Sequence, residues 1–187
     1  MKLYFPLEEP SMQLFLRGLL PRVFPNFREG VDYFLRPHQG KGALQQAIVP
    51  FIKQAKRSSG IKVVIVHDQD NDDCTQLKQK LSNLCAGAQV PVMIRIPCRE
   101  LEAWYLGDHI ALQEVFPEFI RIKNKKQFRN NPDILRKPSD ILSRNISLFT
   151  KSSAAKEIGK IINIKSSEST SFKFFISGLK NFVKNAN

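Results

Sequence analysis

The 187-residue sequence has no long apolar run and only three cysteines. Its apolar stretches, such as residues 63–66, fall far short of the roughly 18 to 20 residues that a transmembrane helix needs. The first residues are too briefly apolar for a signal peptide. Cys74, Cys85 and Cys98 include no CxxC pair, which argues against a zinc knuckle and a disulfide framework. We expect a soluble cytoplasmic protein with reduced, packed cysteines and no membrane partner.

Two common catalytic motifs are also missing. Gly40-Lys41-Gly42 lacks the upstream glycine of a phosphate-binding P-loop, so we expect no ATP site there. Strand alternation points His67 to the face opposite Asp68 and Asp70, so we expect it in the core, and capping explains His109 next to a helix end. Neither histidine stands with a serine or cysteine at the spacing of a nucleophilic triad. The sequence therefore gives no support for triad catalysis.

Positive charge is scarce in the first part of the chain and concentrated in the last. Residues 1–120 hold 14 Lys and Arg against 13 Asp and Glu, whereas residues 121–187 hold 15 against 4. We expect an α/β core over 1–120 and a basic, mainly helical extension over 121–187 that packs on it. Such a segment indicates a polyanionic partner, most often nucleic acid, or else a solvated basic face. The expected phosphate contacts form a basic cluster of Lys123, Lys125, Lys126 and Arg129.

Apolar segments with the period of strands alternate with amphipathic segments. Residues 61–67 are the clearest strand, being β-branched and almost continuously apolar. The β-α-β spacing predicts a parallel sheet flanked by helices. Strands are expected at 2–7, 31–35, 61–67 and 89–96, and helices at 11–20, 43–57, 74–85 and from 99.

Acidic residues follow two of the expected strands. Glu8 and Glu9 come after the first strand, and Asp68 and Asp70 come after the central one. The carboxyl ends of parallel strands meet at one edge of the sheet, where α/β folds hold their sites. Aspartates at i and i+2 in extended backbone project to the same side, so both could bind one hard cation. The pattern predicts a magnesium site.

The same loop admits a second interpretation. Asp and Asn are common in turns that cap helices, so Asp68 and Asp70 could serve only that purpose. Asp72 and Asp73 fit it better, because they lie where the helix expected from residue 74 needs its N-cap. Lys41, in a polar loop at the same edge, either contacts a substrate phosphate or is an ordinary exposed lysine.

A further pair of carboxylates lies after the fourth strand. Glu100 and Glu102 are two residues apart, so on a helix they point about 200° from each other and only one can face the sheet edge. We choose Glu102, whose alternative role is a first-turn carboxylate that favours the helix dipole. Trp104, the single tryptophan, is expected as a core anchor.

Two sets of motifs resemble known families. Glu8 after a strand, with Asp68-Gln69-Asp70 after a hydrophobic strand, resembles the TOPRIM fold of topoisomerases, primases, ribonuclease M5-type maturases and overcoming-lysogenization-defect nucleases. The string from Cys98 to Trp104 (CRELEAW) is similar to the DUF4276 family. Leu7 to Ser11, Asp73-Cys74, Lys137-Pro138 and Ser171-Phe172 also fit that family.

The TOPRIM resemblance implies a nuclease that depends on Mg²⁺ or Mn²⁺. In that comparison Asp68 and Asp70 hold the metal, and Glu8 is a metal ligand or a general acid/base. TOPRIM proteins usually have glycine after the first glutamate, whereas this chain has Glu9, so either glutamate could be the functional one, with Glu8 favoured. Glu102 joins the catalytic set.

The remaining expectations concern substrate and partners. Lys41, Arg99 and the basic cluster are expected to bind the substrate, which is DNA or RNA, including tRNA. Resemblance to relatives in anti-phage defence implies an ABC-type ATPase partner. The alternative is a non-catalytic module that binds a metal or a partner as sensor or scaffold. The sequence leaves the oligomeric state open.

Overall fold

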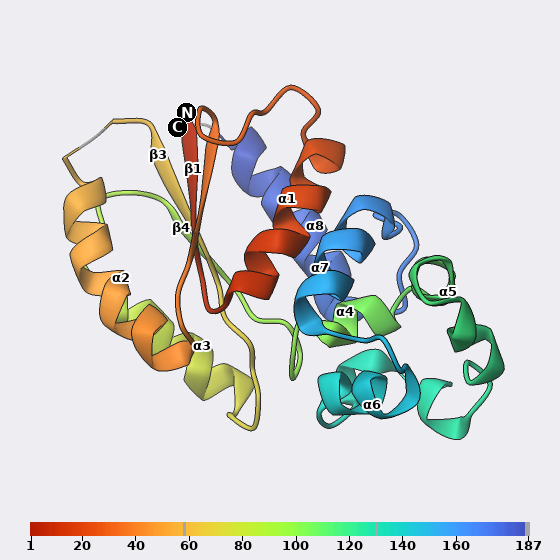
Figure 1. Ribbon diagram of the computed structural model, residues 1–187. Coiled ribbons are helices and arrows are strands. Elements are labelled where there is room, and N and C mark those ends of the chain that lie inside the picture. Colours follow the sequence, from red (N-terminus) through yellow and green to blue (C-terminus); the bar gives the residue numbers. More distant parts are fainter. Residues whose placement is uncertain (58, 130, 186–187) are drawn as a thin grey trace.

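The fold is a four-stranded, all-parallel sheet with helices on both faces, as the computed structural model shows for residues 1–57, 59–129 and 131–185 (Figure 1). The strand order is β2-β1-β3-β4. The α/β class and the parallel sheet expected from the sequence are confirmed. The strands are β1 (Lys2–Leu7), β2 (Tyr33–Pro37), β3 (Ile61–Val66) and β4 (Val92–Arg95).

The register of the strands brings their carboxyl ends to one edge. Strand β3 is buried along its whole length between β1 and β4, which explains its continuous apolar sequence. Leu7 pairs with both Val66 and Pro37, and Val66 pairs with Arg95. The segments that follow these residues therefore leave the sheet side by side.

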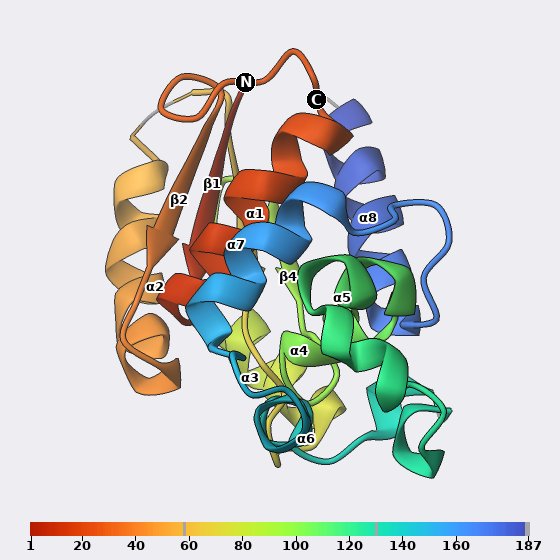
Figure 2. The same ribbon diagram turned by 45° about the vertical axis from the view of Figure 1, so that its right-hand side comes forward.

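Helices α2 and α3 cover one face of the sheet, and α1, α7 and α8 cover the other (Figures 1 and 2). Each face has its own hydrophobic core, and the core on the α1 side is the larger. None of the helices within the described residues is long and apolar enough to cross a membrane. The α-helices are α1 (Pro10–Val23), α2 (Lys41–Ala55), α3 (Cys74–Leu84), α4 (Glu102–Leu106), α5 (His109–Val115), α6 (Pro138–Asn145), α7 (Lys151–Ile161) and α8 (Thr170–Lys184), and the 3₁₀ helices are η1 (Pro117–Arg121), η2 (Lys126–Phe128) and η3 (Pro132–Ile134).

The last third of the chain shares the core of the first two thirds. Phe15 on α1, Trp104 on α4 and Phe172 on α8 lie against one another, with ring centroids 5.3 to 6.3 Å apart. Helices α1 and α7 cross so closely that a Cβ on Gly159 would lie 2.3 Å from the carbonyl oxygen of Phe15. Residues on both sides of the boundary expected near 120 therefore contribute to one core.

The expected elements differ from the observed ones mainly at their ends. Strand β1 has the expected bounds, β2 lies two residues later than expected, and β4 is four residues shorter. The helix expected from residue 99 begins at Glu102, because Arg99 adopts a left-handed backbone conformation with φ of 64° that a helix does not allow. Of the cysteines expected to be packed, Cys85 is buried, whereas Cys74 at the start of α3 is exposed.

Candidate active site at the carboxyl edge of the sheet

Three buried carboxylates converge where β1 and β3 end. Glu8, Asp68 and Glu102 are 8%, 4% and 0% exposed, although carboxylates are rarely buried without a partner. Glu8 follows β1, and its Oε2 accepts a hydrogen bond of 2.8 Å from the backbone nitrogen of Asp68 after β3. Glu102 enters from the first residue of α4. The register of the sheet therefore brings together acids that are far apart in the sequence.

His67 fixes the orientation of Glu8. Its Nδ1 lies 3.0 Å from Oε2 of Glu8, and its Nε2 lies 3.0 Å from the amide nitrogen of Gln45 on α2. Burial lowers the pKa of His67, but the hydrogen bond and the charge of Glu8 outweigh burial and raise the pKa above its ordinary value. His67 is fully buried as expected. His67 nevertheless contacts the acidic site, because its Nδ1 lies against Glu8.

Several polar atoms of this buried acidic cluster lack a hydrogen-bond partner among the described residues. Oδ1 of Asp68, both carboxylate oxygens of Glu102 and the hydroxyl of Tyr105 are buried without a hydrogen bond to any described residue. The ammonium group of Lys151 on α7 lies 3.9 Å from Oε1 of Glu102 and 3.5 Å from Oε2 of Glu9. Buried polar atoms are normally hydrogen-bonded, so unpaired carboxylate oxygens indicate a missing ligand or proton.

The electrostatics of the pocket favour protons on its acids. Burial raises the pKa of Asp68 well above its ordinary value, and the negative charges of Glu102 and Glu8 raise it further. Burial also raises the pKa of Glu102 to about 7, against the lowering effect of Lys151. Burial lowers the pKa of Lys151, but the charges of Glu102 and Glu9 raise it by more. Without another cation, Lys151 is the main compensation for these charges among the described residues.

Asp70 is more exposed than the three buried acids. The strand ends at Val66, and Asp70 adopts a left-handed conformation with φ of 52°, so the extended geometry expected for Asp68 and Asp70 is wrong. The side chain of Asp70 is 36% exposed, and its Oδ2 lies 3.6 Å from Nζ of Lys41. Burial raises the pKa of Asp70, and the charge of Glu8 adds to this effect.

The capping interpretation applies to one member of the acidic loop. Asp73 is the N-cap of α3 and accepts a hydrogen bond of 2.9 Å from the backbone nitrogen of Gln76. Oδ2 of Asp72 lies 3.7 Å from Nζ of Lys41. Lys41 therefore lies between Asp70 and Asp72.

Glu100 and Glu102 have different surroundings, although Glu100 lies outside the helix that begins at Glu102. Glu102 lies in the buried pocket, whereas Oε2 of Glu100 accepts a hydrogen bond of 2.8 Å from the backbone nitrogen of Ser139. Trp104 is the expected core anchor, because it is buried, stacks on Phe175 and donates a hydrogen bond to Ser171. His109 begins α5, and its neighbour Asp108 is the N-cap of that helix.

The basic cluster lies away from the buried acids. Lys123 donates a hydrogen bond to Gln113 and Lys125 donates one to Asn145, while Lys126 begins η2 and Arg129 follows it. A polar hollow of ≈ 650 Å³ is lined by Lys123, Arg129 and Lys173, among others. Arg99 instead lies in the loop before α4, where its Nη1 donates a hydrogen bond to the carbonyl oxygen of Asp70.

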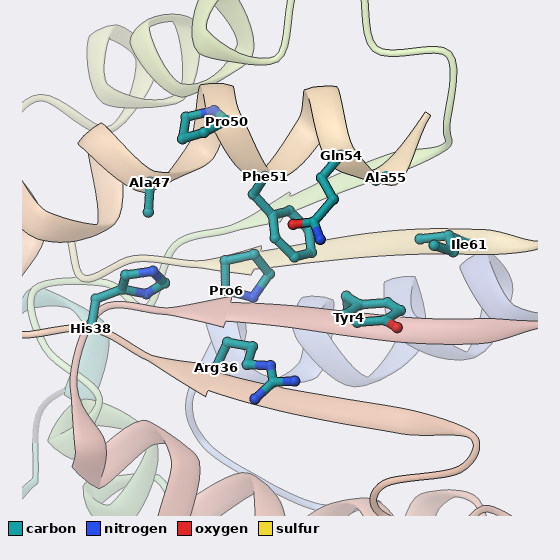
Figure 3. A pocket seen from close by; sticks show the side chains of 10 residues that line it. All are labelled: Tyr4, Pro6, Arg36, His38, Ala47, Pro50, Phe51, Gln54, Ala55 and Ile61. Carbon is teal, nitrogen blue, oxygen red and sulfur yellow. The ribbon is translucent and has the colours of Figure 1, made fainter. Parts of the chain in front are cut away.

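The pocket in Figure 3 lies elsewhere. It has a volume of ≈ 580 Å³ between α2 and strands β1 and β2, with aromatic walls from Tyr4 and Phe51. His38 stands at one end and Ile61 at the other (Figure 3). No carboxylate lines this pocket, so the acid chemistry of the protein belongs to the edge of the sheet.

A divalent cation suits the donors of the buried pocket. Unpaired carboxylate oxygens of Asp68 and Glu102, beside Glu8, are hard ligands of the type that Mg²⁺ and Mn²⁺ bind. In the described parts of the chain, however, no three His, Cys, Asp or Glu side chains stand in the arrangement of a metal site. Of the metal ligands expected from the sequence, Glu8 and Asp68 are neighbours, and Asp70 is separate.

Lys151 and Tyr105 escaped the sequence reasoning. Lys151 is 142 residues from Glu9, and no local pattern marks a lysine on a basic amphipathic helix as a partner of buried acids. Tyr105 stands inside the CRELEAWY string, whose acidic residues alone drew attention. Only the packing of α7 and α4 on the sheet edge reveals both.

Comparison with known proteins finds one family. A family model described as "Domain of unknown function (DUF4276)" matches residues 7–180. The match includes all four candidate carboxylates and Lys151. No curated protein and no solved structure matches the chain.

Proposed function

The chain belongs to the DUF4276 family, and we propose that it is a divalent-metal-dependent nuclease that hydrolyses phosphodiester bonds of DNA or RNA. One observation carries the proposal: Glu8, Asp68 and Glu102 form a buried cluster in which oxygens of Asp68 and Glu102 have no hydrogen-bond partner among the described residues. Three acids in a buried place repel one another unless protons or cations neutralise them. The single ammonium group of Lys151 compensates only part of that charge.

The residues of the pocket suit different tasks in hydrolysis. Asp68 and Glu102 would hold the cation, with Glu8 as a third ligand or as the general base. A bound Mg²⁺ or Mn²⁺ would polarise a phosphoryl oxygen and lower the pKa of a water molecule. Without the cation, burial raises the pKa of Glu102 to about 7, so binding of the cation would displace a proton from this carboxylate near neutral pH. His67 keeps Glu8 in place through the hydrogen bond between them.

Substrate and partners complete the proposal. The excess of 15 Lys and Arg over 4 Asp and Glu in residues 121–187 supports a polyanionic substrate. The TOPRIM likeness, the role in anti-phage defence and the ABC-type ATPase partner rest on the resemblance of the motifs around Glu8 and Asp68. A cytoplasmic location is proposed from the cysteine pattern.

A non-catalytic module is the second candidate function, and Lys151 is the observation that favours it. An ammonium group already lies within 3.9 Å of Glu102 and 3.5 Å of Glu9, as in a buried structural ion pair. In this case a basic group of a partner protein, not a metal, would complete the pocket.

Cleavage assays with pure protein test the proposal. Duplex DNA, single-stranded DNA, tRNA and total RNA are each incubated with Mg²⁺, with Mn²⁺ and with chelator. We expect metal-dependent cleavage that falls by at least about 100-fold in Glu8→Gln, Asp68→Asn and Glu102→Gln, because each removes a metal ligand or a proton acceptor. Asp72→Asn should stay nearly as active as the wild type, since the side chain of Asp72 is exposed and forms only a long ion pair with Lys41 among the described residues.

The activity of Asp70→Asn tests whether the loop after β3 rearranges around a metal. A loss as large as that of Asp68→Asn would place Asp70 among the ligands, as its spacing predicted. Full activity of folded Asp68→Asn would refute the mechanism. Nucleic-acid binding without cleavage under every metal condition would support the non-catalytic module instead.

A further inference from the structure

A small cleft lies next to the buried carboxylates. Its volume is ≈ 170 Å³, and its cationic walls are Lys41 at the start of α2, Arg99 in the loop after β4 and Lys137 directly before α6. Asp70, Glu100 and Asn71 also line it. Three basic and two acidic side chains give this cation cleft a net charge of +1. Three distant segments of the chain thus bring positive charge to one point.

The backbone of the cation cleft is strained. Asp70, Arg99 and Lys137 have φ of 52°, 64° and 49°, and within the described residues they are the only non-glycine residues with positive φ. All three line this cleft. The left-handed conformation is unfavourable for a residue with a Cβ, and glycine would adopt it without that penalty. The chain nevertheless places charged side chains there, which indicates that the side chains themselves are needed.

Hydrogen bonds hold the walls of the cleft in position. The backbone nitrogen of Asp70 donates to the carbonyl oxygen of Arg99 at 2.7 Å, and Nη1 of Arg99 donates to the carbonyl oxygen of Asp70 at 3.1 Å. The backbone nitrogen of Arg99 donates to Oε1 of Gln69 at 3.1 Å. Glu100 accepts from Ser139 and so ties this loop to the start of α6. The charged groups are therefore organised before any ligand arrives.

The two lysines are available to an anion. Nζ of Lys41 lies 3.6 Å from Asp70 and 3.7 Å from Asp72, and Nζ of Lys137 lies 3.8 Å from Asp140. These distances exceed those of hydrogen bonds, and both lysine side chains are at least half exposed. A phosphate oxygen could replace the long ion pairs with short, charge-assisted hydrogen bonds.

The cation cleft and the carboxylate pocket share two loops. Asp70 in the cleft follows Asp68 in the pocket by two residues, and Glu100 in the cleft precedes Glu102 in the pocket by two residues. A strand whose phosphate lay in the cleft would therefore pass the carboxylates. The volume of the cleft suits one phosphate group and is too small for a nucleoside.

We propose that the cation cleft binds one phosphate group of the nucleic-acid strand beside the bond that the carboxylates cleave. The inference rests on the proposed nuclease function for the identity of the strand. The planar guanidinium of Arg99 supplies directional hydrogen bonds, while Lys41 and Lys137 supply point charges. The phosphate is either the terminal monoester of a strand end or an internal diester.

Fluorescence polarisation with chelator present tests the cleft apart from catalysis. The probes are a labelled oligonucleotide with a 5′-phosphate and the same oligonucleotide with a 5′-hydroxyl. We expect Arg99→Gln and Lys137→Gln each to raise the Kd about tenfold, as the loss of one charge-assisted hydrogen bond predicts. Lys53→Gln, which removes an exposed charge from the same helix as Lys41, should change the Kd less than twofold.

Two further comparisons sharpen the test. Lys137→Gly should weaken binding as Lys137→Gln does while its melting temperature equals or exceeds that of the wild type, because glycine relieves the positive φ. If the cleft binds a terminal phosphate, the wild type should bind the 5′-hydroxyl probe weakly. Its Kd for that probe should be about the Kd of Lys137→Gln for the 5′-phosphate probe. An internal phosphate predicts equal binding of both probes, with the same loss in the variants.

The outcomes separate the cleft from the nuclease. If the variants of Arg99 and Lys137 bind both probes as tightly as Lys53→Gln does, the cleft proposal is refuted. This holds even if the wild type cleaves nucleic acid and the variants cleave it with the KM of the wild type. If these variants lose binding while the wild type cleaves nothing with either metal, the cleft binds phosphate and the nuclease proposal fails.

Discussion

Glu102 makes the stability of the protein fall as pH rises. Burial raises its pKa from an ordinary value of 4.5 to about 7. The folded protein therefore binds a proton between these pH values that the unfolded chain has released, and this proton favours the folded state. The contribution is fully present below about pH 4.5 and is lost as pH rises through about 7. A paired carboxylate with a lowered pKa would show the opposite trend.

The size of the effect follows from the difference between the two pKa values. Each pKa unit corresponds to about 1.36 kcal/mol, so ionising Glu102 in place costs about 3 kcal/mol of unfolding free energy. At about 2 to 4 °C per kcal/mol for a chain of this size, the melting temperature should change by about 6 to 12 °C. Glu102→Gln keeps the shape of the side chain and removes the charge. Lys151 then retains Glu9 as its partner at 3.5 Å.

Urea unfolding from pH 5 to 8.5 in chelator measures this contribution. Other groups titrate in both proteins, so the informative quantity is the unfolding free energy of the wild type minus that of Glu102→Gln. This difference should fall by about 2.5 kcal/mol between pH 5 and 8, because part of the total is already lost at pH 5. The control is Glu114→Gln, which changes an exposed glutamate on α5 and should give a flat difference.

A flat or rising difference for Glu102→Gln would refute the argument that burial controls this carboxylate. Magnesium adds a second arm at pH 8. A metal held by Glu102 stabilises the wild type by about 2.7 kcal/mol at 100 times its Kd. Glu102→Gln should lose most of that response. Equal responses in the two proteins would remove Glu102 from the metal site.

Two further predictions address the fold and the basic cluster. Gly159→Ala should destabilise the protein by about 1 to 3 kcal/mol in urea unfolding, because its Cβ would lie 2.3 Å from the carbonyl oxygen of Phe15. Gly42→Ala, in a helix with open space around it, should be neutral or stabilising by up to about 1 kcal/mol. An equal loss of unfolding free energy in Gly159→Ala and Gly42→Ala would contradict the close crossing of α1 and α7. Changing all four residues of the basic cluster to glutamine should reduce the slope of log affinity for duplex DNA against log salt by up to about 3.6, since each phosphate contact contributes about 0.9. An unchanged slope would show that the cluster is solvated surface.

The strands could be predicted because local sequence determines them. Residues 61–66 are apolar and almost all β-branched, which suits a central parallel strand and few other structures. The same local signals gave the helices α2 and α3 to within two residues. Alternation of strands and helices then restricts the sheet to parallel order, because crossovers of this kind are right-handed.

The contacts of the last third could not be predicted in the same way. Lys151 reaches Glu9 and Glu102 only because α7 packs against α1 through Gly18 and Gly159. Neither glycine belongs to a turn or has a positive φ, so neither stands out in the sequence. A contact between residues 142 positions apart depends on the whole packed core, which no local pattern encodes.

The site also shows why spacing rules for regular backbone apply to neither pair of acids. Glu100 lies outside α4, which begins at Glu102, so the helical spacing assumed for this pair is absent. Asp70 adopts a left-handed conformation beyond the end of β3, so the extended spacing assumed for Asp68 and Asp70 is absent too. In each pair one acid is buried, namely Asp68 or Glu102, and the other, Asp70 or Glu100, lines the cation cleft. Each of the two short acidic motifs thus contributes one residue to the buried acids and one to the cation cleft. The left-handed conformations of Asp70 and Arg99 direct the chain from the buried acids to the cleft.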